Sequence, residues 1–253
     1  MIILDEPYVS PELAAYAAAR QEPVLDNSTA RACARDYGAA LNLTPEDAFA
    51  SLCREDAPRL YTCSENALDW VYAHSGNNAL VERVRRLKDK AVCRERLAPL
   101  YADFFFRQVT LEELAALPFE TLKVPCVLKP AVGFFSLGVH RIENAAQWEA
   151  AKVAVARDAA LWREQYPPEV VGGGRFLLEE YIQGEEYAVD VYYDRQGRAV
   201  VCNILRHEFS SDADVSDRLY YTSREIIESR LNEFEAWFNR VNGPLGLRNF
   251  PVH

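Results

Sequence analysis

The chain has 253 residues, of which 28 are basic and 38 acidic, and its formal net charge is −10. This balance argues against a nucleic-acid partner, because phosphate backbones are bound mainly through lysine and arginine. With 49% hydrophobic and 26% charged residues, the composition is that of a folded protein of one or two domains rather than a disordered chain.

The first residues and the cysteines bear on the compartment. Residues 1–6 carry no basic segment leading into an apolar core, and no apolar run in the sequence approaches the roughly 18 residues of a membrane span. The six cysteines form no C-x-x-C pair, which favours reduced thiols. We therefore expect a cytoplasmic protein with no membrane partner.

Short apolar runs alternate with helix starts in residues 1–87. An apolar run at 2–4 is followed by Ser10-Pro11-Glu12, which supplies a capping serine, a proline and an acid for the first turn of a helix. The alternation continues with runs at 23–26 and 59–62 and a helix start at 44–47 between them. The pattern predicts a small α/β domain, similar in layout to a Rossmann-like unit but without a G-x-G-x-x-G turn for a dinucleotide.

Longer and more apolar elements follow. Residues 124–129 have the pattern of a buried strand, and Asn144 with Gln147 forms a capping-box variant that opens a helix with one apolar face. Three further strand-like runs are separated by turn residues and predict an antiparallel meander: 176–182, 187–193 and 199–205.

A final helix is predicted from the apolar residues between 227 and 241, which step by four and three. Residues 242–244 (Asn-Gly-Pro) should stop it. The change to longer elements places a domain boundary near residue 87.

One segment has the residue types of a phosphate site. Lys129 ends the predicted buried strand, and Gly133, Ser136 and Gly138 follow in the next turn. A fixed cation beside exposed backbone N–H groups can hold phosphate oxygens. The order of lysine and glycines differs from that of the two common phosphate loops. The alternative is an ordinary loop between two strands with a surface lysine.

A second segment places four acidic residues around a turn within residues 176–190. One interpretation is a nucleotide clamp, in which backbone groups near Glu180 and Ile182 pair with an adenine edge and the Glu186 carboxylate accepts from ribose hydroxyls. The alternative is a solvated hairpin turn with alternating strands on either side.

The order and spacing of these segments over residues 88–253 resemble the ATP-grasp superfamily, of the carboxylate–amine or carboxylate–thiol ligase type. The resemblance implies a lid subdomain at about 88–178 and the start of a central sheet at 179–253, after a small α/β domain at 1–87. It also implies an ATP site, at these positions: Lys90, Lys129, Gly133, Ser136, Gly138, Glu179, Glu180, Ile182 and Glu186.

The chemistry that this resemblance implies is ADP-forming ligation. A small carboxylate substrate takes the γ-phosphoryl group of ATP, and an amine or thiol then displaces phosphate. Lys90 and Lys129 would hold phosphate oxygens, so no side-chain nucleophile is required and none is assigned. Arg218 is a candidate anion contact. The alternative function is a non-catalytic nucleotide-binding or interaction module.

In this family, carboxylates that bind Mg²⁺ follow a G-x-x-x-F-P-V-H-like run, and residues 246–253 match the beginning of that run. The resemblance therefore implies magnesium ligands beyond His253 and a truncated chain with weak or no activity. Four aspartates are weaker candidates for the metal: Asp190, Asp212, Asp214 and Asp217. An incomplete central sheet would leave an exposed edge, which predicts a homodimer.

Overall fold

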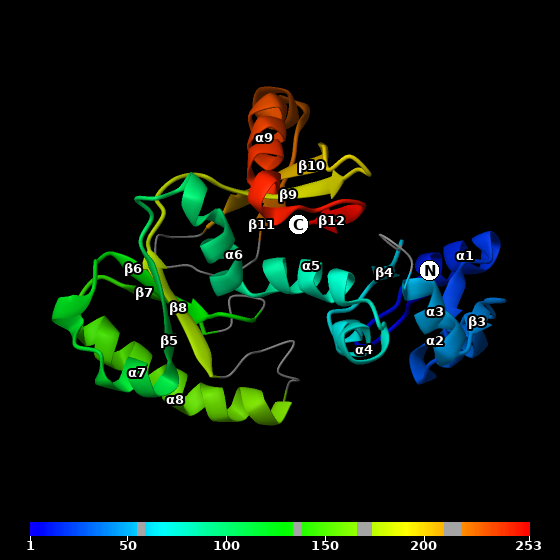
Figure 1. Cartoon of the computed structure of the whole chain (residues 1–253), viewed down its shortest axis with the longest axis horizontal. Coiled ribbons are helices and arrows are strands. Elements are labelled where there is room, and N and C mark those ends of the chain that lie inside the picture. Colours follow the sequence, from blue (N-terminus) through cyan, green and yellow to red (C-terminus); the bar gives the residue numbers. More distant parts are fainter. Residues whose placement is uncertain (55–58, 134–137, 166–173, 210–218) are drawn as a thin grey trace. The chain divides into compact units, whose positions relative to one another are not determined.

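The computed structural model describes residues 1–54, 59–133, 138–165, 174–209 and 219–253 (Figure 1). The chain forms two units, Met1–Glu82 and Arg83–His253. This division and the predicted boundary near residue 87 both fall within one helix, α5 (Asn78–Lys88). The finer ranges predicted for a lid subdomain and a central sheet remain predictions.

The first unit is built on a parallel sheet of four short strands. The alternating runs predict three of them, and the fourth, at Asn42–Thr44, was not predicted. The strand order is β3-β2-β1-β4, with β3 at Asn42–Thr44, β2 at Pro23–Leu25, β1 at Ile2–Ile3 and β4 at Tyr61–Thr62. Its helices are α1 (Pro11–Arg20), α2 (Ser28–Asp36), α3 (Glu46–Cys53) and α4 (Ala67–His74). The expected Ser10 cap is present, since its hydroxyl accepts from the Leu13 N–H at 3.1 Å.

The second unit contains two four-stranded sheets. In the first, the order is β5-β8-β6-β7, all antiparallel, with β5 at Phe106–Thr110, β8 at Arg175–Glu180, β6 at Cys126–Pro130 and β7 at His140–Ile142. Helices α7 (Leu111–Ala116) and α8 (Ala145–Gln165) supply the core on one face of this sheet. Short 3₁₀ turns lie at Ala98–Leu100 and Phe119–Thr121.

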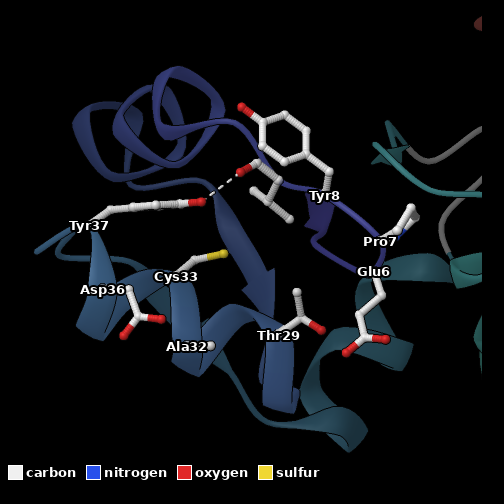
Figure 2. A pocket seen from close by; sticks show the side chains of 9 residues that line it. Glu6, Pro7, Tyr8, Thr29, Ala32, Cys33, Asp36 and Tyr37 are labelled. Atoms are coloured by element: carbon white, nitrogen blue, oxygen red, sulfur yellow. Dashed lines mark hydrogen bonds between the residues drawn. The ribbon is translucent and has the colours of Figure 1, made fainter.

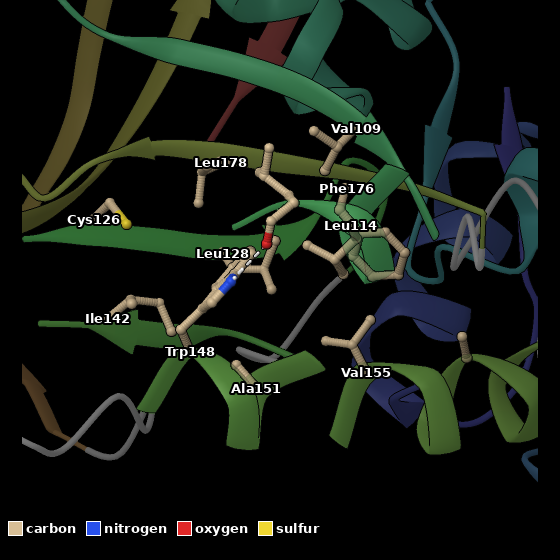
Figure 3. Packing of buried hydrophobic residues seen from close by; sticks show 12 residues of the cluster. Val109, Leu114, Cys126, Leu128, Ile142, Trp148, Ala151, Val155, Phe176 and Leu178 are labelled. Carbon is tan, nitrogen blue, oxygen red and sulfur yellow. Dashed lines mark hydrogen bonds between the residues drawn. The ribbon is translucent and has the colours of Figure 1, made fainter. Parts of the chain in front are cut away.

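The core under α8 forms because both elements bury one apolar stripe. The predicted apolar face of α8 supplies Trp148, Ala151 and Val155, and strand positions two apart supply Cys126 and Leu128 (Figure 3). Asn144 caps α8 as predicted, accepting from the Gln147 N–H at 3.0 Å. The Gln147 side chain reaches back one residue further than the capping box requires, to the Glu143 N–H at 2.7 Å.

The second sheet has the order β11-β10-β9-β12, also antiparallel. The strands are β11 (Leu219–Tyr221), β10 (Ala199–Glu208), β9 (Glu186–Tyr193) and β12 (Phe250–Val252), and helix α9 (Arg224–Leu245) packs on them. The predicted helix is therefore confirmed, but it ends later than expected. Gly246, with φ of 65°, provides the left-handed cap, and Pro244 lies inside the last turn.

The predicted three-strand meander is wrong in one strand. β9 and β10 form the expected hairpin, whereas β8 pairs with β5 on one side and β6 on the other. Both edges of β8 are thus occupied, so β9 cannot pair with it. The chain instead crosses from the first sheet to the second through residues 181–185, which the alternating pattern alone cannot distinguish from a hairpin turn.

Helix α6 (Lys90–Leu97) connects the cores of the two sheets. Ala91 is fully buried against Ala131 and Leu177 of the first sheet region, while Leu97 belongs to the core of the second sheet.

Within the described residues, no helix is both long and apolar enough to cross a membrane.

We expect Trp148→Ala to lower the free energy of unfolding by about 3–5 kcal/mol, because it empties the centre of the α8 core. Trp148 is fully buried, and its indole N–H donates to the Leu117 carbonyl at 3.0 Å. Urea unfolding followed by circular dichroism measures the loss. Val153→Ala is the control on the same helix, since Val153 is 70% exposed and its change should stay within about 0.5 kcal/mol. Similar losses in both variants would contradict this account of the core.

Candidate functional site

Lys129 and Glu179 lie on the face of the first sheet that is turned away from the α8 core. Side chains alternate along a strand, so the buried Leu128 and Leu178 point into that core and their neighbours Lys129 and Glu179 point to the other face. There the Lys129 Nζ forms an ion pair with Glu179 Oε1. The Glu179 side chain is only 5% exposed, so its charge needs compensation inside the protein.

Arg94, on α6, provides a second cation for the same carboxylate. Its Nε donates to Glu179 Oε2 at 2.7 Å, and its guanidinium carbon lies 4.5 Å from the centre of the Phe104 ring. Burial by itself would raise the pKa of Glu179, but the hydrogen bond from Arg94 and the charges of Lys129 and Arg94 outweigh it and lower that pKa. The three side chains therefore carry one net positive charge at neutral pH. We call this group the Glu179 cluster.

Arg94 is not among the residues predicted from the sequence. A signal was present, because Lys90 and Arg94 are four residues apart and lie on one face of α6. That spacing shows only that the two cations are neighbours, since the buried carboxylate that pairs with Arg94 comes from a strand 85 residues later in the chain.

Lys90 is the first residue of α6, and its position is fixed against the end of β6. Its backbone N–H donates to the Ala131 carbonyl at 2.8 Å, and its Nζ donates to the Gly133 carbonyl at 3.0 Å. The Asp89 side chain caps the helix by accepting from the Ala91 and Val92 N–H groups, and it also forms an ion pair with Arg175 on β8. These bonds hold the start of the helix beside the start of the predicted phosphate loop.

The predicted loop itself is described only at its two ends. Gly133 receives the Lys90 contact, and Gly138 has φ of 70°, a conformation that favours glycine. Ser136 lies in residues 134–137, outside the described part of the chain. Arg218 also lies outside it, in residues 210–218.

The backbone groups predicted to pair with adenine, a segment called here the hinge, lie at the end of β8 and just after it. The Glu180 N–H is already bonded to the Phe105 carbonyl at 3.0 Å, and its carboxylate pairs with Lys123 at 2.8 Å. That hydrogen bond is the main reason why the pKa of Glu180 is lowered. Ile182 is 63% exposed, and its backbone N–H has no hydrogen-bond partner among the described residues. The Ile182 N–H is therefore open to a ligand.

Glu186 is the first residue of β9 and lies opposite His207 on β10. The His207 Nδ1 is 2.9 Å from Glu186 Oε1, and the imidazole is buried between Phe209 and Tyr220, which stacks on it at 4.2 Å. The Glu186 side chain is 57% exposed, so one side of the carboxylate is held while the other faces solvent. No pattern in the sequence indicates His207 as its partner.

The structure thus brings together Lys90, Lys129, Gly133 and Glu179 where α6 packs on the first sheet. Of the remaining described positions, Gly138 lies just before β7. Glu180, Ile182 and Glu186 follow one another from the end of β8 to the start of β9. Figure 1 shows this connection between the two sheets. The roles given to them from the sequence stay predictions at this point.

No group of three or more His, Cys, Asp or Glu side chains in the described ranges could hold a metal ion. Asp190, one of the weaker metal candidates, pairs instead with His253 at 2.8 Å. The other three, Asp212, Asp214 and Asp217, fall outside those ranges.

A pocket of about 180 Å³ lies in the first unit, between the connection after β1 and helix α2 (Figure 2). The Tyr37 hydroxyl closes one side by donating to the Val9 carbonyl at 3.0 Å, and burial raises the pKa of the Cys33 thiol in its wall. None of the lining side chains is among the described groups with a buried polar atom that lacks a partner. Nothing in this pocket therefore marks a specific ligand.

A family model for the ATP-grasp domain matches residues 122–253, just over half of the chain, and the protein belongs to that family. The match confirms the resemblance of the sequence motifs and, with the mixed helices and antiparallel sheets, the predicted fold class. It includes the strand that carries Lys129, the hinge and Glu186, and it leaves out helix α6.

Three similar proteins are two ligases and a synthetase. D-alanine–D-alanine ligase of Granulibacter bethesdensis is 33% identical over 168 residues, which cover 64% of this chain and 47% of that protein. L-amino acid ligase from Bacillus licheniformis superposes with a TM-score of 0.60 at 19% identity, over 99% of this chain and 61% of that one. N5-carboxyaminoimidazole ribonucleotide synthetase, solved as its ADP complex, superposes with a TM-score of 0.56 at 16% identity, over 97% of this chain and 63% of that one. The chain spans about half the length of the curated relative that it matches.

We expect Glu179→Gln to lower the free energy of unfolding at neutral pH by about 2–3 kcal/mol. This is less than the usual loss for a broken buried pair, because Lys129 and Arg94 keep some contact with water. A carboxyl with a lowered pKa stabilises the fold above its unfolded pKa of about 4.3, and this contribution is lost as the pH falls through the folded pKa. The variant should therefore lose less stability than the wild type on acidification, as measured by urea unfolding.

Glu180→Gln is the matched control, since it makes the same change one residue later, in a pair with a Lys123 side chain that is 60% exposed. Its loss should be much smaller than that of Glu179→Gln, because water screens an exposed pair. Equal losses for the two variants would show that burial of Glu179 has no special role in stability.

Proposed function

We propose that this chain binds ATP as part of an ADP-forming ligase that joins a small carboxylate to an amine or thiol. The observation that carries the proposal is the Glu179 cluster with its net positive charge, next to Lys90 and Gly133 in a chain of the ATP-grasp family. The similar proteins named as ligases, and the one solved as an ADP complex, support it.

The lysines are suited to hold phosphate oxygens. Lys129 is 20% exposed, so its charge is partly shielded from water and interacts with an anion more strongly than that of a fully exposed lysine. Lys90 Nζ is oriented by the Gly133 carbonyl toward the start of the loop. In phosphoryl transfer the protein contributes mainly position and charge, which these groups provide without a side-chain nucleophile.

The connection between the sheets is suited to the nucleoside. The open Ile182 N–H can donate to an adenine ring nitrogen, and the exposed side of the Glu186 carboxylate can accept from ribose hydroxyls. In this proposal His207 keeps Glu186 in place, and Ser136, Gly138 and Arg218 retain the phosphate or anion roles expected from the sequence.

Magnesium, when bound, would neutralise the β- and γ-phosphate oxygens. The described residues offer no cluster of carboxylates for it, so the steps assigned to this chain are binding and orientation of the nucleotide. A homodimer and a cytoplasmic location remain predictions.

We expect Lys129→Ala to weaken binding of a non-hydrolysable ATP analogue by about 10- to 100-fold, the effect of losing one hydrogen bond to a charged group. Lys90→Ala should act in the same direction. Calorimetric titration with and without Mg²⁺ measures the affinity.

Lys152→Ala is the control, because Lys152 lies on α8 and pairs with Glu149 on that helix. Unchanged affinity in both Lys129→Ala and Lys90→Ala would refute the phosphate site.

Ligation is tested separately, by measuring release of ADP when the chain is given ATP with pairs of small carboxylates and amines. Binding without ADP release for any pair would favour a non-catalytic nucleotide-binding module.

We expect Glu186→Gln to reduce the preference of the chain for ATP over 2′,3′-dideoxy-ATP. The wild type should bind ATP more tightly by about 10-fold or more, because a hydroxyl bonded to a carboxylate contributes about 1.5–3 kcal/mol. Glu185→Gln is the control at the neighbouring position, where the carboxylate pairs with Arg206 and Arg230. A wild-type chain that does not distinguish the two nucleotides would exclude Glu186 as the ribose contact.

A further inference from the structure

We propose that Arg94 is a positioning residue for the phosphate site: by pairing with Glu179, it allows Lys129 to bind phosphate without leaving a buried carboxylate uncompensated. This inference rests on the proposed function, which gives Lys129 its phosphate. It assigns to Arg94 a role that requires no contact with the nucleotide.

The geometry of the Glu179 cluster gives the carboxylate two separate partners. Arg94 bonds to Oε2 at 2.7 Å, and Lys129 pairs with Oε1. The two cations come from different elements, α6 and β6, so one can move while the other stays. Arg94 is also held from its other side by the Phe104 ring.

Without Arg94, Glu179 and Lys129 would form a neutral pair. Phosphate would then have to compete with Glu179 for Lys129, the one cation left in the cluster. If phosphate won, the carboxylate would stay buried without a partner. A buried carboxylate in that position relieves the cost by taking up a proton. ATP binding would therefore become weaker and linked to proton uptake.

With Arg94 present, neither consequence arises. The cluster keeps one net positive charge before phosphate binds, and Glu179 keeps one hydrogen-bonded cation after Lys129 engages the phosphate. The carboxylate can stay ionised throughout, so binding to this site requires no proton.

The other groups around Glu179 do not replace Arg94. From α6, Asp89 is negative and already paired with Arg175, and Cys93 has a pKa raised by burial, so it remains a neutral thiol. On the neighbouring strands, the residues opposite Glu179 are Val127 on β6 and Phe106 on β5, both without charge. Within the described residues, Arg94 and Lys129 are the cations that pair with this carboxylate.

The test compares ATP affinity between about pH 6 and about pH 8.5, expressed at each pH as the ratio to wild type because ATP itself titrates. Arg94→Gln should bind about 10- to 100-fold more weakly at the upper pH. Its deficit should shrink as the pH falls, by up to about tenfold per pH unit, which corresponds to uptake of one proton. Arg94→Lys, which keeps the charge, should recover most of the affinity.

The double variant Arg94→Gln/Glu179→Gln distinguishes positioning from a general structural role. Removing the carboxylate removes the competitor for Lys129, so the double variant should bind more tightly than Arg94→Gln and should show the pH dependence of wild type. Arg224→Gln is the control, since it breaks an exposed pair with Glu228 on α9 and should change nothing.

Two results would overturn the role of Arg94: Arg94→Gln binding as wild type at the upper pH, or a deficit that is equal at every pH and persists in the double variant. If Arg94→Gln does not fold, the double variant decides alone, because it lacks both the Arg94 and the Glu179 charge. If that variant folds but does not bind ATP, the proposal is overturned. No ATP binding by the wild-type chain would refute the proposed function itself, which separates the two failures.

Discussion

Compensation of the buried Glu179 carboxylate constrains the whole second unit. A carboxylate this deeply buried is tolerated only with cations at hydrogen-bond distance, and it receives one from a neighbouring strand and one from a helix. β8, β6 and α6 must therefore take up their mutual positions together. The same requirement brings Lys129 and Arg94 to one point and leaves a net positive charge where the glycine-containing turn begins.

Helix α6 is the element through which this constraint reaches the rest of the unit. Its first turn is fixed by the Asp89 cap and by two bonds from Lys90 to the end of the first sheet, while Leu97 at its other end packs in the core of the second sheet. One short helix thus orients a candidate phosphate-binding lysine and also connects the two sheets. The family match begins after this helix, so α6 is linked to the candidate site by its contacts and not by the matched region.

The chain crosses from one sheet to the other at the segment where a nucleoside would be held. Residues 181–185 leave β8 with the Ile182 N–H open, and β9 begins at Glu186 with its carboxylate steadied by His207. The Ile182 N–H is a hydrogen-bond donor that suits an adenine base, and the exposed Glu186 carboxylate oxygen is an acceptor that suits the ribose attached to it. In the proposed site, Lys129 for the phosphates and Ile182 and Glu186 for the nucleoside lie on one continuous chain segment, β6 to β9, whereas Lys90 comes from α6.

Local patterns in the sequence determined several elements of this protein and its family. The cap at Ser10, the apolar stripe of α8 and the order of the lysine, glycine and acidic motifs are all properties of near neighbours in the chain, which propensity and periodicity describe well. Tertiary structure alone decided three things: that β8 joins the first sheet, that Arg94 shares Glu179 with Lys129, and that His207 holds Glu186. Each depends on which distant segments meet, and a pattern with a period of two or four residues carries no information about a partner tens of residues away.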